Sequence, residues 1–167
     1  MKNRAVGEKN DVLSPDFLDF ITCLERSGVD YVLVGSYAMA IHGVVRATGD
    51  IDFLYRLTEP NVRRLCAALE EFGAPPVVID KSALLTPDIV TQFGEPPYRI
   101  DLLNGIDGVT FEQVWKSATH AMIGDQDVRV IGQTELRANK SATGRKKDAD
   151  DVRRLNPRRV KKKGRGR

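Results

Sequence analysis

The strongest constraint on this fold is a set of aspartates that stand in two short apolar segments. Asp50 and Asp52 open the segment DIDFLY, and Asp101 lies inside YRIDLL at 98–103. Short runs of branched and aromatic residues such as these are typical of buried strands. A carboxylate in such a strand is costly unless it is paired or ligates a cation. The chain must therefore fold so that these acids meet water, a partner or a metal.

Alternation along the first segment predicts that Asp50 and Asp52 point to one side of their strand, with Ile51 turned toward the core. Two carboxylates side by side repel unless a cation lies between them, and Mg²⁺ prefers one or two carboxylates together with phosphate oxygens. If the strand of Asp101 lies beside theirs, the three acids form one site for Mg²⁺ or Mn²⁺. Two alternatives stay open: Asp50 and Asp52 face water at a strand end, and Asp101 lies on an edge strand or pairs with Arg99.

A third apolar run, Tyr31–Val34, predicts a buried strand that leads directly into a helix at Gly35 and Ser36. Glycine lets the backbone turn tightly and approach a ligand. The amides of a first helical turn favour an anion, and Ser36 adds a hydroxyl donor. This junction is a candidate phosphate site, and simple helix capping is the alternative.

The remaining hydrophobic pattern predicts alternating helices and strands, with breaks at Gly and Pro. The expected helices cover 14–27, 36–42, 58–72, 111–118, 134–142 and 146–155, and the expected strands cover 31–34, 51–55, 77–79 and 98–103, with a hairpin over 121–131 that turns at Gly124-Asp125. This order predicts an α/β (α+β) fold, a small mixed sheet with flanking helices and a short C-terminal helical piece. We expect a flexible N-terminus at 1–12, a core at 13–132, a helical segment at 133–155 and a basic flexible tail at 156–167.

The composition is that of a globular protein, with 41% hydrophobic and 29% charged residues among 167. No apolar run approaches the ~18 residues of a membrane span, and residues 1–12 lack the apolar stretch of a signal peptide, so we expect a cytoplasmic protein without membrane contact. Cys23 and Cys66 lie in helical apolar patterns and are expected to be buried, and His42 is expected to pack at a helix end.

The charge is distributed unevenly along the chain. Seven of the 26 basic residues lie in 156–167, where there is no acid, so the remaining 19 basic residues stand against 23 acidic ones. Such a tail could bind RNA by neutralising phosphates. The alternative is a solvated terminus without a specific role.

Taken in order, VGSYAMAIHG, RATGDIDFLY and RIDLL resemble the nucleotidyltransferase superfamily that includes DNA polymerase beta. Within it, the chain is most similar to the abortive-infection-type (AbiEii-like) group and its solitary relatives, which also share a tract like KSATGRKKDADD. The resemblance implies the nucleotidyltransferase fold. It also implies that Gly35 and Ser36 hold the triphosphate and that Asp50, Asp52 and Asp101 are catalytic metal ligands, with Asp101 helping to deprotonate the acceptor hydroxyl.

Four basic residues are further candidates for binding the nucleotide: Arg46, Lys140, Arg145 and Lys147. For Arg46, the alternative to nucleotide binding is a solvated arginine in a loop. The other three have an alternative too, because KKDADDVRR also fits an exposed helix laced by ion pairs, with Asp148 and Asp151 capping and pairing on it.

The expected reaction is metal-dependent transfer of a nucleoside monophosphate from a nucleoside triphosphate such as ATP or GTP to a hydroxyl, with release of pyrophosphate. The acceptor could be RNA, a protein or a small molecule. The toxin of a toxin–antitoxin pair, with an antitoxin protein as partner, is one biological setting, and a solitary enzyme is another. The alternative class is a non-catalytic nucleotide- or RNA-binding module, or an antitoxin-like interaction partner, on the same fold.

Overall fold

The computed structural model describes residues 13–45 and 47–155. The expectations for the N-terminus at 1–12, for Arg46 and for the basic tail at 156–167 lie outside these residues.

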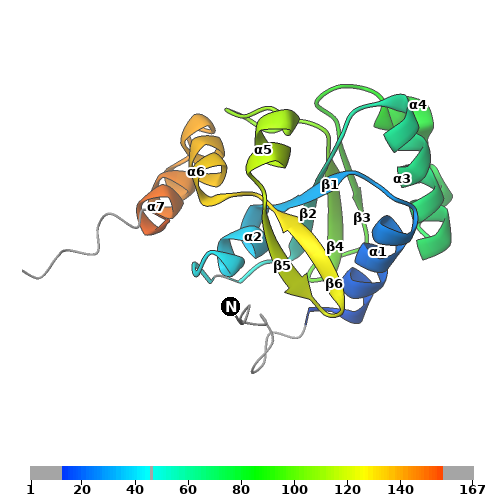
Figure 1. The fold of residues 1–167 in the computed structure, drawn as a ribbon, viewed down its shortest axis with the longest axis horizontal. Helices are drawn as coiled ribbons and strands as arrows, with labels where there is room; N and C mark the ends of the chain where they lie inside the picture. The colour runs from blue at the N-terminus through cyan, green and yellow to red at the C-terminus, as the bar shows by residue number, and fades with distance from the viewer. Residues whose placement is uncertain (1–12, 46, 156–167) are drawn as a thin grey trace, which may run out of the picture.

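One mixed sheet of six strands organises the described chain, in the order β3-β4-β2-β1-β6-β5 (Figure 1). The strands are β1 (Tyr31–Val34), β2 (Asp50–Tyr55), β3 (Val90–Phe93), β4 (Arg99–Leu103), β5 (Thr119–Ile123) and β6 (Gln126–Val130). β2 runs parallel to β4 and antiparallel to β1, and β1 runs parallel to β6. β3 and β5 close the two edges by antiparallel pairing with β4 and β6. The predicted class, a mixed sheet with flanking helices, is confirmed.

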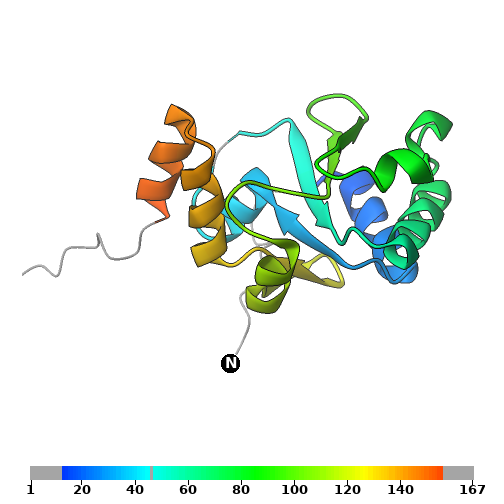
Figure 2. The same ribbon diagram turned by 90° about the horizontal axis from the view of Figure 1, so that it is seen from above.

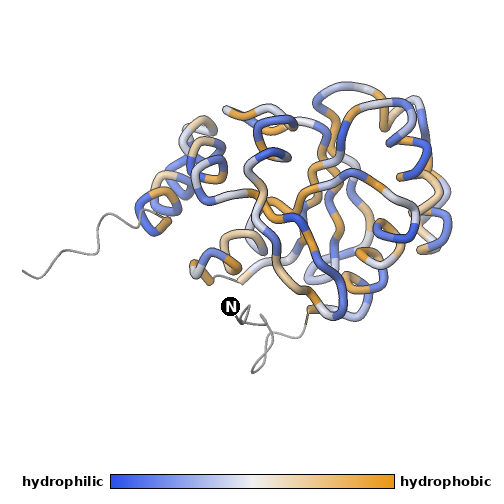
Figure 3. The backbone as a smooth tube through the Cα atoms, in the orientation of Figure 1, coloured by the Kyte–Doolittle hydropathy of each residue, from blue (hydrophilic) through white to orange (hydrophobic). Residues whose placement is uncertain are grey.

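The helices lie on two sides of this sheet. They are α1 (Pro15–Arg26), α2 (Gly35–Ile41), α3 (Glu59–Phe72), α4 (Lys81–Leu84), α5 (Phe111–Ser117), α6 (Gln133–Ala142) and α7 (Lys146–Arg154). Seen from above, α1 and α3 pack on one side, and α6 and α7 stand together on the other (Figure 2). Hydrophobic positions concentrate in the strands and on the inner sides of α1 and α3, while α7 is largely hydrophilic (Figure 3).

The core lies between the sheet and the α1–α3 pair. Phe20 of α1 makes edge contacts with Phe53 of β2, Phe72 of α3 and Phe93 of β3. Ile51 is fully buried, so the face of β2 that carries Ile51 and Phe53 belongs to the core. The opposite face of β2 is therefore left to Asp50 and Asp52, as alternation predicts.

Local sequence signals explain most of the element ends. Ser14 caps α1 with Pro15 at the first turn, and Thr58 caps α3 in the same manner. The hairpin predicted around Gly124 forms as β5 and β6, with that glycine in the left-handed region at φ 58°. Both predicted C-terminal helices form as α6 and α7.

The segment between α3 and β4 departs from the prediction. The strand expected at 77–79 is wrong: Pro76–Val78 forms a 3₁₀ turn, in which Val77 is 83% exposed. Pro76 lacks the N–H that a strand ladder requires, and no neighbour covers the valine. The edge strand of this region is β3 instead, and the short α4 precedes it. Among the described residues, no helix is long and apolar enough to cross a membrane.

Candidate active site

The register of three strands brings the acidic residues into one row. In the parallel β2–β4 pair, Asp52 lies opposite Asp101, and Asp50 lies opposite Arg99. Gln92 of β3 lies opposite Asp101 on the other side. Opposed residues share a face of the sheet, so these five side chains stand on the face away from α1 and α3.

The three aspartates converge closely enough to share a cation. One carboxylate oxygen from each of Asp50, Asp52 and Asp101 lies within 4.8 Å of the other two. Asp101 is 5% exposed, whereas Asp50 and Asp52 are half-buried. Three acids at such spacing form a donor set of hard oxygen ligands, which suits Mg²⁺ or Mn²⁺.

Arg99 is the cation that pairs with this cluster. Its Nε donates to Asp101 Oδ1 at 2.9 Å, and its Nη2 donates to Asp50 Oδ2 at 3.0 Å and to Asp101 Oδ2 at 3.2 Å. Thr48 Oγ1 donates to the other Asp50 oxygen at 2.9 Å, and Gln92 Nε2 donates to Asp101 Oδ2 at 3.3 Å. Asp101 therefore both pairs with Arg99, one of the alternatives weighed from the sequence, and joins the acidic cluster.

The pKa values of the three aspartates follow from their partial burial and from the shortage of positive charge around them. Burial raises the pKa of Asp52 to about 8, and repulsion from Asp50 and Asp101 adds to the effect. Burial also raises the pKa of Asp101, against the attraction of Arg99. Burial opposes ionisation of Asp50 as well, but hydrogen bonds from Asp101, Thr48 and Arg99 hold its pKa below the ordinary value. One guanidinium does not balance three carboxylates, so a divalent cation fits this site electrostatically.

Gly35 is required by the position of Asp52. Its φ is +70°, and a Cβ placed on it would lie 2.1 Å from Asp52 Oδ2 and 2.9 Å from Asp52 Cγ. The Asp52 carboxylate thus rests against the backbone at the start of α2. Only glycine permits both this backbone conformation and this approach.

A cleft of about 400 Å³ opens beside the aspartates. One wall carries Gly35, Ser36, Asp50 and Asp52, and the other is formed by α6, α7 and the turn between them. The second wall contributes Asn139, Lys140, Thr143, Arg145, Lys147 and Asp148. The lining of the cleft therefore brings the carboxylates of Asp50 and Asp52 together with the basic side chains of Lys140, Arg145 and Lys147.

Lys140 is embedded in a buried ion-pair cluster that joins the two C-terminal helices. Its Nζ lies 3.2 Å from Asp148 Oδ1 and 3.3 Å from Asp151 Oδ2. Asp148 also accepts from Thr143 Oγ1 at 2.6 Å and from Arg145 Nε at 2.7 Å. Asp148 and Asp151 are 1% and 0% exposed. The alternative of an exposed helix with surface pairs is therefore wrong for these two acids, because they face α6 rather than solvent.

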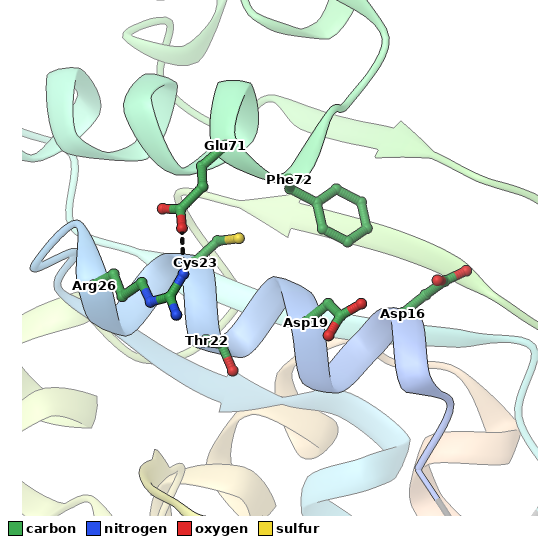
Figure 4. Close-up of a pocket in the computed structure, with 7 residues that line it drawn as sticks. All are labelled: Asp16, Asp19, Thr22, Cys23, Arg26, Glu71 and Phe72. Atoms are coloured by element: carbon green, nitrogen blue, oxygen red, sulfur yellow. Dashed lines mark hydrogen bonds and ion pairs between the residues drawn. The ribbon is translucent and has the colours of Figure 1, made fainter.

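A second cavity of about 400 Å³ lies between α1 and α3, on the other side of the sheet (Figure 4). It is lined by the acids Asp16, Asp19 and Glu71, and an Arg26–Glu71 ion pair of 2.8 Å closes one end. Burial raises the pKa of the neighbouring Cys23 thiol, which keeps this cysteine protonated and a poor nucleophile. Cys23 is buried, as expected, whereas Cys66 is only half-buried.

Most residues predicted for the site line the cleft, but two partners of the cluster were missed. Gly35, Ser36, Asp50, Asp52, Lys140, Arg145 and Lys147 line the cleft, Asp101 lies beside Asp52, and Arg46 is outside the described residues. Sequence reasoning gave no role to Thr48 or Gln92, and it offered Arg99 only as an alternative partner of Asp101. Side chains alternate along a strand, so Arg99 lies on the same face as Asp101, which follows it by two residues. This alternation is the sequence signal that marks Arg99 as a neighbour of the acidic site. His42 caps the end of α2, as expected, and its Nε2 lies 2.7 Å from the Ile131 carbonyl oxygen.

The sequence profile of the family described as "Nucleotidyl transferase of unknown function (DUF2204)" matches residues 14–166. Among solved structures, the chain is similar to the lincosamide antibiotic adenylyltransferase LnuA, solved with lincomycin bound. The TM-score is 0.52 at 13% identity, over 87% of this chain and 98% of that one. An antigenic nucleotidyltransferase-like protein from Paracoccidioides brasiliensis gives a TM-score of 0.50 at 13% identity, over 84% of this chain and 72% of that one. No curated protein matches the sequence. At these identities the two neighbours show a shared fold.

Proposed function

This chain belongs to that nucleotidyl transferase family, and from this premise we propose that it moves a nucleoside monophosphate from a metal-bound nucleoside triphosphate to a hydroxyl, releasing pyrophosphate. The observation that carries the proposal is the cluster of Asp50, Asp52 and Asp101, in which one carboxylate oxygen of each lies within 4.8 Å of the other two, beside a cleft that is also lined by basic residues. The alternative of a non-catalytic binding module does not account for a complete set of metal ligands.

Asp50, Asp52 and Asp101 would hold Mg²⁺ or Mn²⁺, and their uncompensated negative charge supports this fit. The bound ion would stabilise the charge on the reacting phosphate and lower the pKa of the attacking hydroxyl. In the displacement, the acceptor oxygen forms a bond to the α-phosphorus while the bond from that phosphorus to pyrophosphate breaks. Asp101, which lies opposite Asp52 in the β2–β4 pair, is the group proposed to take the hydroxyl proton.

The remaining cleft residues are proposed to bind and orient the triphosphate. Gly35 and Ser36 bring backbone amides and a hydroxyl to the wall that carries the metal ligands. Arg145 and Lys147 on the opposite wall would offset the charge of the departing pyrophosphate. Lys140 would act in the same place, although its ammonium is already shared by Asp148 and Asp151. Because α6 and α7 form this wall, the core at 13–132 and the helical segment at 133–155 are proposed to work as one catalytic unit.

The acceptor is open to two proposals with different support. The neighbour LnuA is named as an adenylyltransferase of lincosamide antibiotics, and nearly all of its chain aligns with this one, which favours a small hydroxylated molecule. The seven basic residues of 156–167 favour RNA. The AbiEii-like subgroup, a toxin role and an antitoxin partner remain proposals that rest on the sequence resemblance alone.

The test is a transfer assay with each labelled nucleoside triphosphate, with Mg²⁺ or Mn²⁺, and with either total RNA or a pool of hydroxylated small molecules as acceptor. Label should pass to one acceptor class, and chelation of the metal should stop the transfer. Tight binding of a triphosphate without transfer to any acceptor would instead support the non-catalytic alternative.

A further inference from the structure

We propose that Arg99 is an exchangeable counter-ion of the aspartate cluster, which makes the metal bind together with the nucleotide rather than before it. This inference rests on the proposed function. It concerns a residue that neither the sequence motifs nor the family match assigns to the site.

Arg99 occupies the oxygens that a metal would need. Its guanidinium donates to both oxygens of Asp101 and to Oδ2 of Asp50, at 2.9 to 3.2 Å. The second Asp50 oxygen accepts from Thr48. A bidentate, charge-assisted arrangement of this kind is among the stronger pairings available to a carboxylate. A metal ion entering from solvent must therefore compete with a cation that is already in place.

Two of the other described cations that line the cleft are committed elsewhere. Lys140 is shared between Asp148 and Asp151, and Arg145 Nε pairs with Asp148. In the part of the chain that the structure describes, the charge of the aspartate cluster is thus offset mainly by Arg99. Removing Arg99 would leave three adjacent carboxylates that repel one another, which strengthens their attraction for a divalent cation.

Arg99 can leave the cluster more readily than Asp101 can. The Arg99 side chain is 31% exposed, whereas that of Asp101 is 7% exposed and lies on the strand between β2 and β3, and Asp50, at 27%, is about as exposed as Arg99. Arg99 lies at the first position of β4, where its long side chain can turn toward solvent without breaking the strand. The short side chains of Asp50 and Asp101 stay near the backbone positions that the pairing of β2 and β4 sets, so the guanidinium is the member of the cluster that can move away.

A nucleoside triphosphate resolves the competition in two ways. It supplies phosphate oxygens that complete the coordination of the metal, and it supplies anions that can accept the displaced guanidinium. Metal and nucleotide should therefore bind with positive coupling, and coupling is reciprocal between two ligands. When the metal is present alone, no phosphate oxygens complete its coordination and no phosphate accepts the guanidinium. Arg99 therefore stays paired with Asp50 and Asp101.

Mn²⁺ binding to the protein tests this directly when it is followed by the loss of the free-ion signal in electron paramagnetic resonance and corrected for the Mn²⁺ that each nucleotide analogue binds in protein-free samples. Wild-type protein should bind Mn²⁺ weakly alone, and about tenfold or more tightly with α,β-methylene analogues of ATP or GTP, a coupling of ordinary size. Arg99→Gln should bind Mn²⁺ about tenfold more tightly than wild type without nucleotide, and lose most of the coupling. Arg26→Gln, which breaks a surface pair with Glu71, is the matched control and should behave as wild type.

Arg99→Lys guards against a folding failure of the glutamine variant. It keeps the charge but cannot bridge Asp50 and Asp101 with a planar fork, so its Mn²⁺ affinity without nucleotide should lie between the other two. Equal Mn²⁺ affinity in wild type and both Arg99 variants would overturn the counter-ion role while leaving the proposed function intact. Failure of Mn²⁺ to bind to any variant, with or without either analogue, would overturn both.

Discussion

Replacing Gly35 with alanine should disable the site through a contact that can be located to single atoms. The new Cβ would lie 2.1 Å from Asp52 Oδ2 and 3.1 Å from Asp52 Cβ, while the backbone is held at φ +70°. Left-handed backbone costs alanine about 1–2 kcal/mol. Pushing the Asp52 side chain away from its rotamer costs about 0.5–1.5 kcal/mol more.

Gly28 provides a control that separates these two costs. Its φ is +69°, but the nearest atom to a Cβ there is Arg64 Cδ at 3.9 Å, an ordinary contact. Gly28→Ala should therefore carry the backbone cost alone. For a chain of this size, the extra cost at Gly35 corresponds to a melting temperature lower by roughly 1–6 °C than that of Gly28→Ala.

The assay is thermal unfolding of both variants together with nucleotide transfer. Transfer should fall by about 10²-fold or more in Gly35→Ala, because displacement of a reacting group by ~1 Å has that effect, and should stay near wild type in Gly28→Ala. In an Asp52→Ala background the added destabilisation at Gly35 should largely disappear. The same melting temperature for the two glycine variants, with transfer retained at Gly35→Ala, would refute the reasoning.

Three further predictions concern charge. Burial raises the folded-state pKa of Asp52 from 3.8 to about 8, so the metal-free protein should lose stability as pH rises across that window. Melting curves in chelator should show this trend, and Asp52→Asn should weaken it, leaving the part that the raised pKa of Asp101 contributes. Lys140→Met should lower the free energy of unfolding in urea by about 3–5 kcal/mol, because it removes the cation that the buried Asp148 and Asp151 share, although Arg145 still pairs with Asp148. Lys147→Met should change this free energy by less than about 0.5 kcal/mol, and similar values for the two variants would contradict the buried pairing. Deleting 156–167 should leave triphosphate binding unchanged and flatten the salt dependence of RNA binding, and equal slopes for both forms would exclude the tail as an RNA contact.

The sequence predicts the acidic row because local alternation suffices for it. Asp50 and Asp52 are two residues apart in an apolar strand, and Asp101 stands alone in another, so each is marked without knowledge of the fold. The pairing of Arg99 with Asp50 is different. It joins residues 49 positions apart and depends on the parallel register of β2 and β4, which no local pattern fixes.

The contrast between local sequence patterns and tertiary contacts also explains the two other places where the structure differs from the sequence prediction. Asp148 and Asp151 belong to a stretch so rich in charge that it resembles a solvated helix, and they are buried because α6 presents Lys140 to them. The valines before α4 resemble a strand, but Pro76 and the exposure of Val77 go with a turn. Tertiary contacts override composition in the first case, and proline geometry overrides propensity in the second.

The central claim is that the three aspartates form a metal site for nucleotidyl transfer, and Asp52→Asn tests it most directly. The substitution preserves shape and, above the Asp52 pKa of about 8, removes one charge from a crowded cluster, so the melting temperature in chelator should hold or rise there. Transfer from the labelled triphosphate to the acceptor should be abolished, and Mg²⁺ should no longer stabilise the protein in the presence of nucleotide. Transfer at the wild-type rate in a folded Asp52→Asn protein would contradict the account.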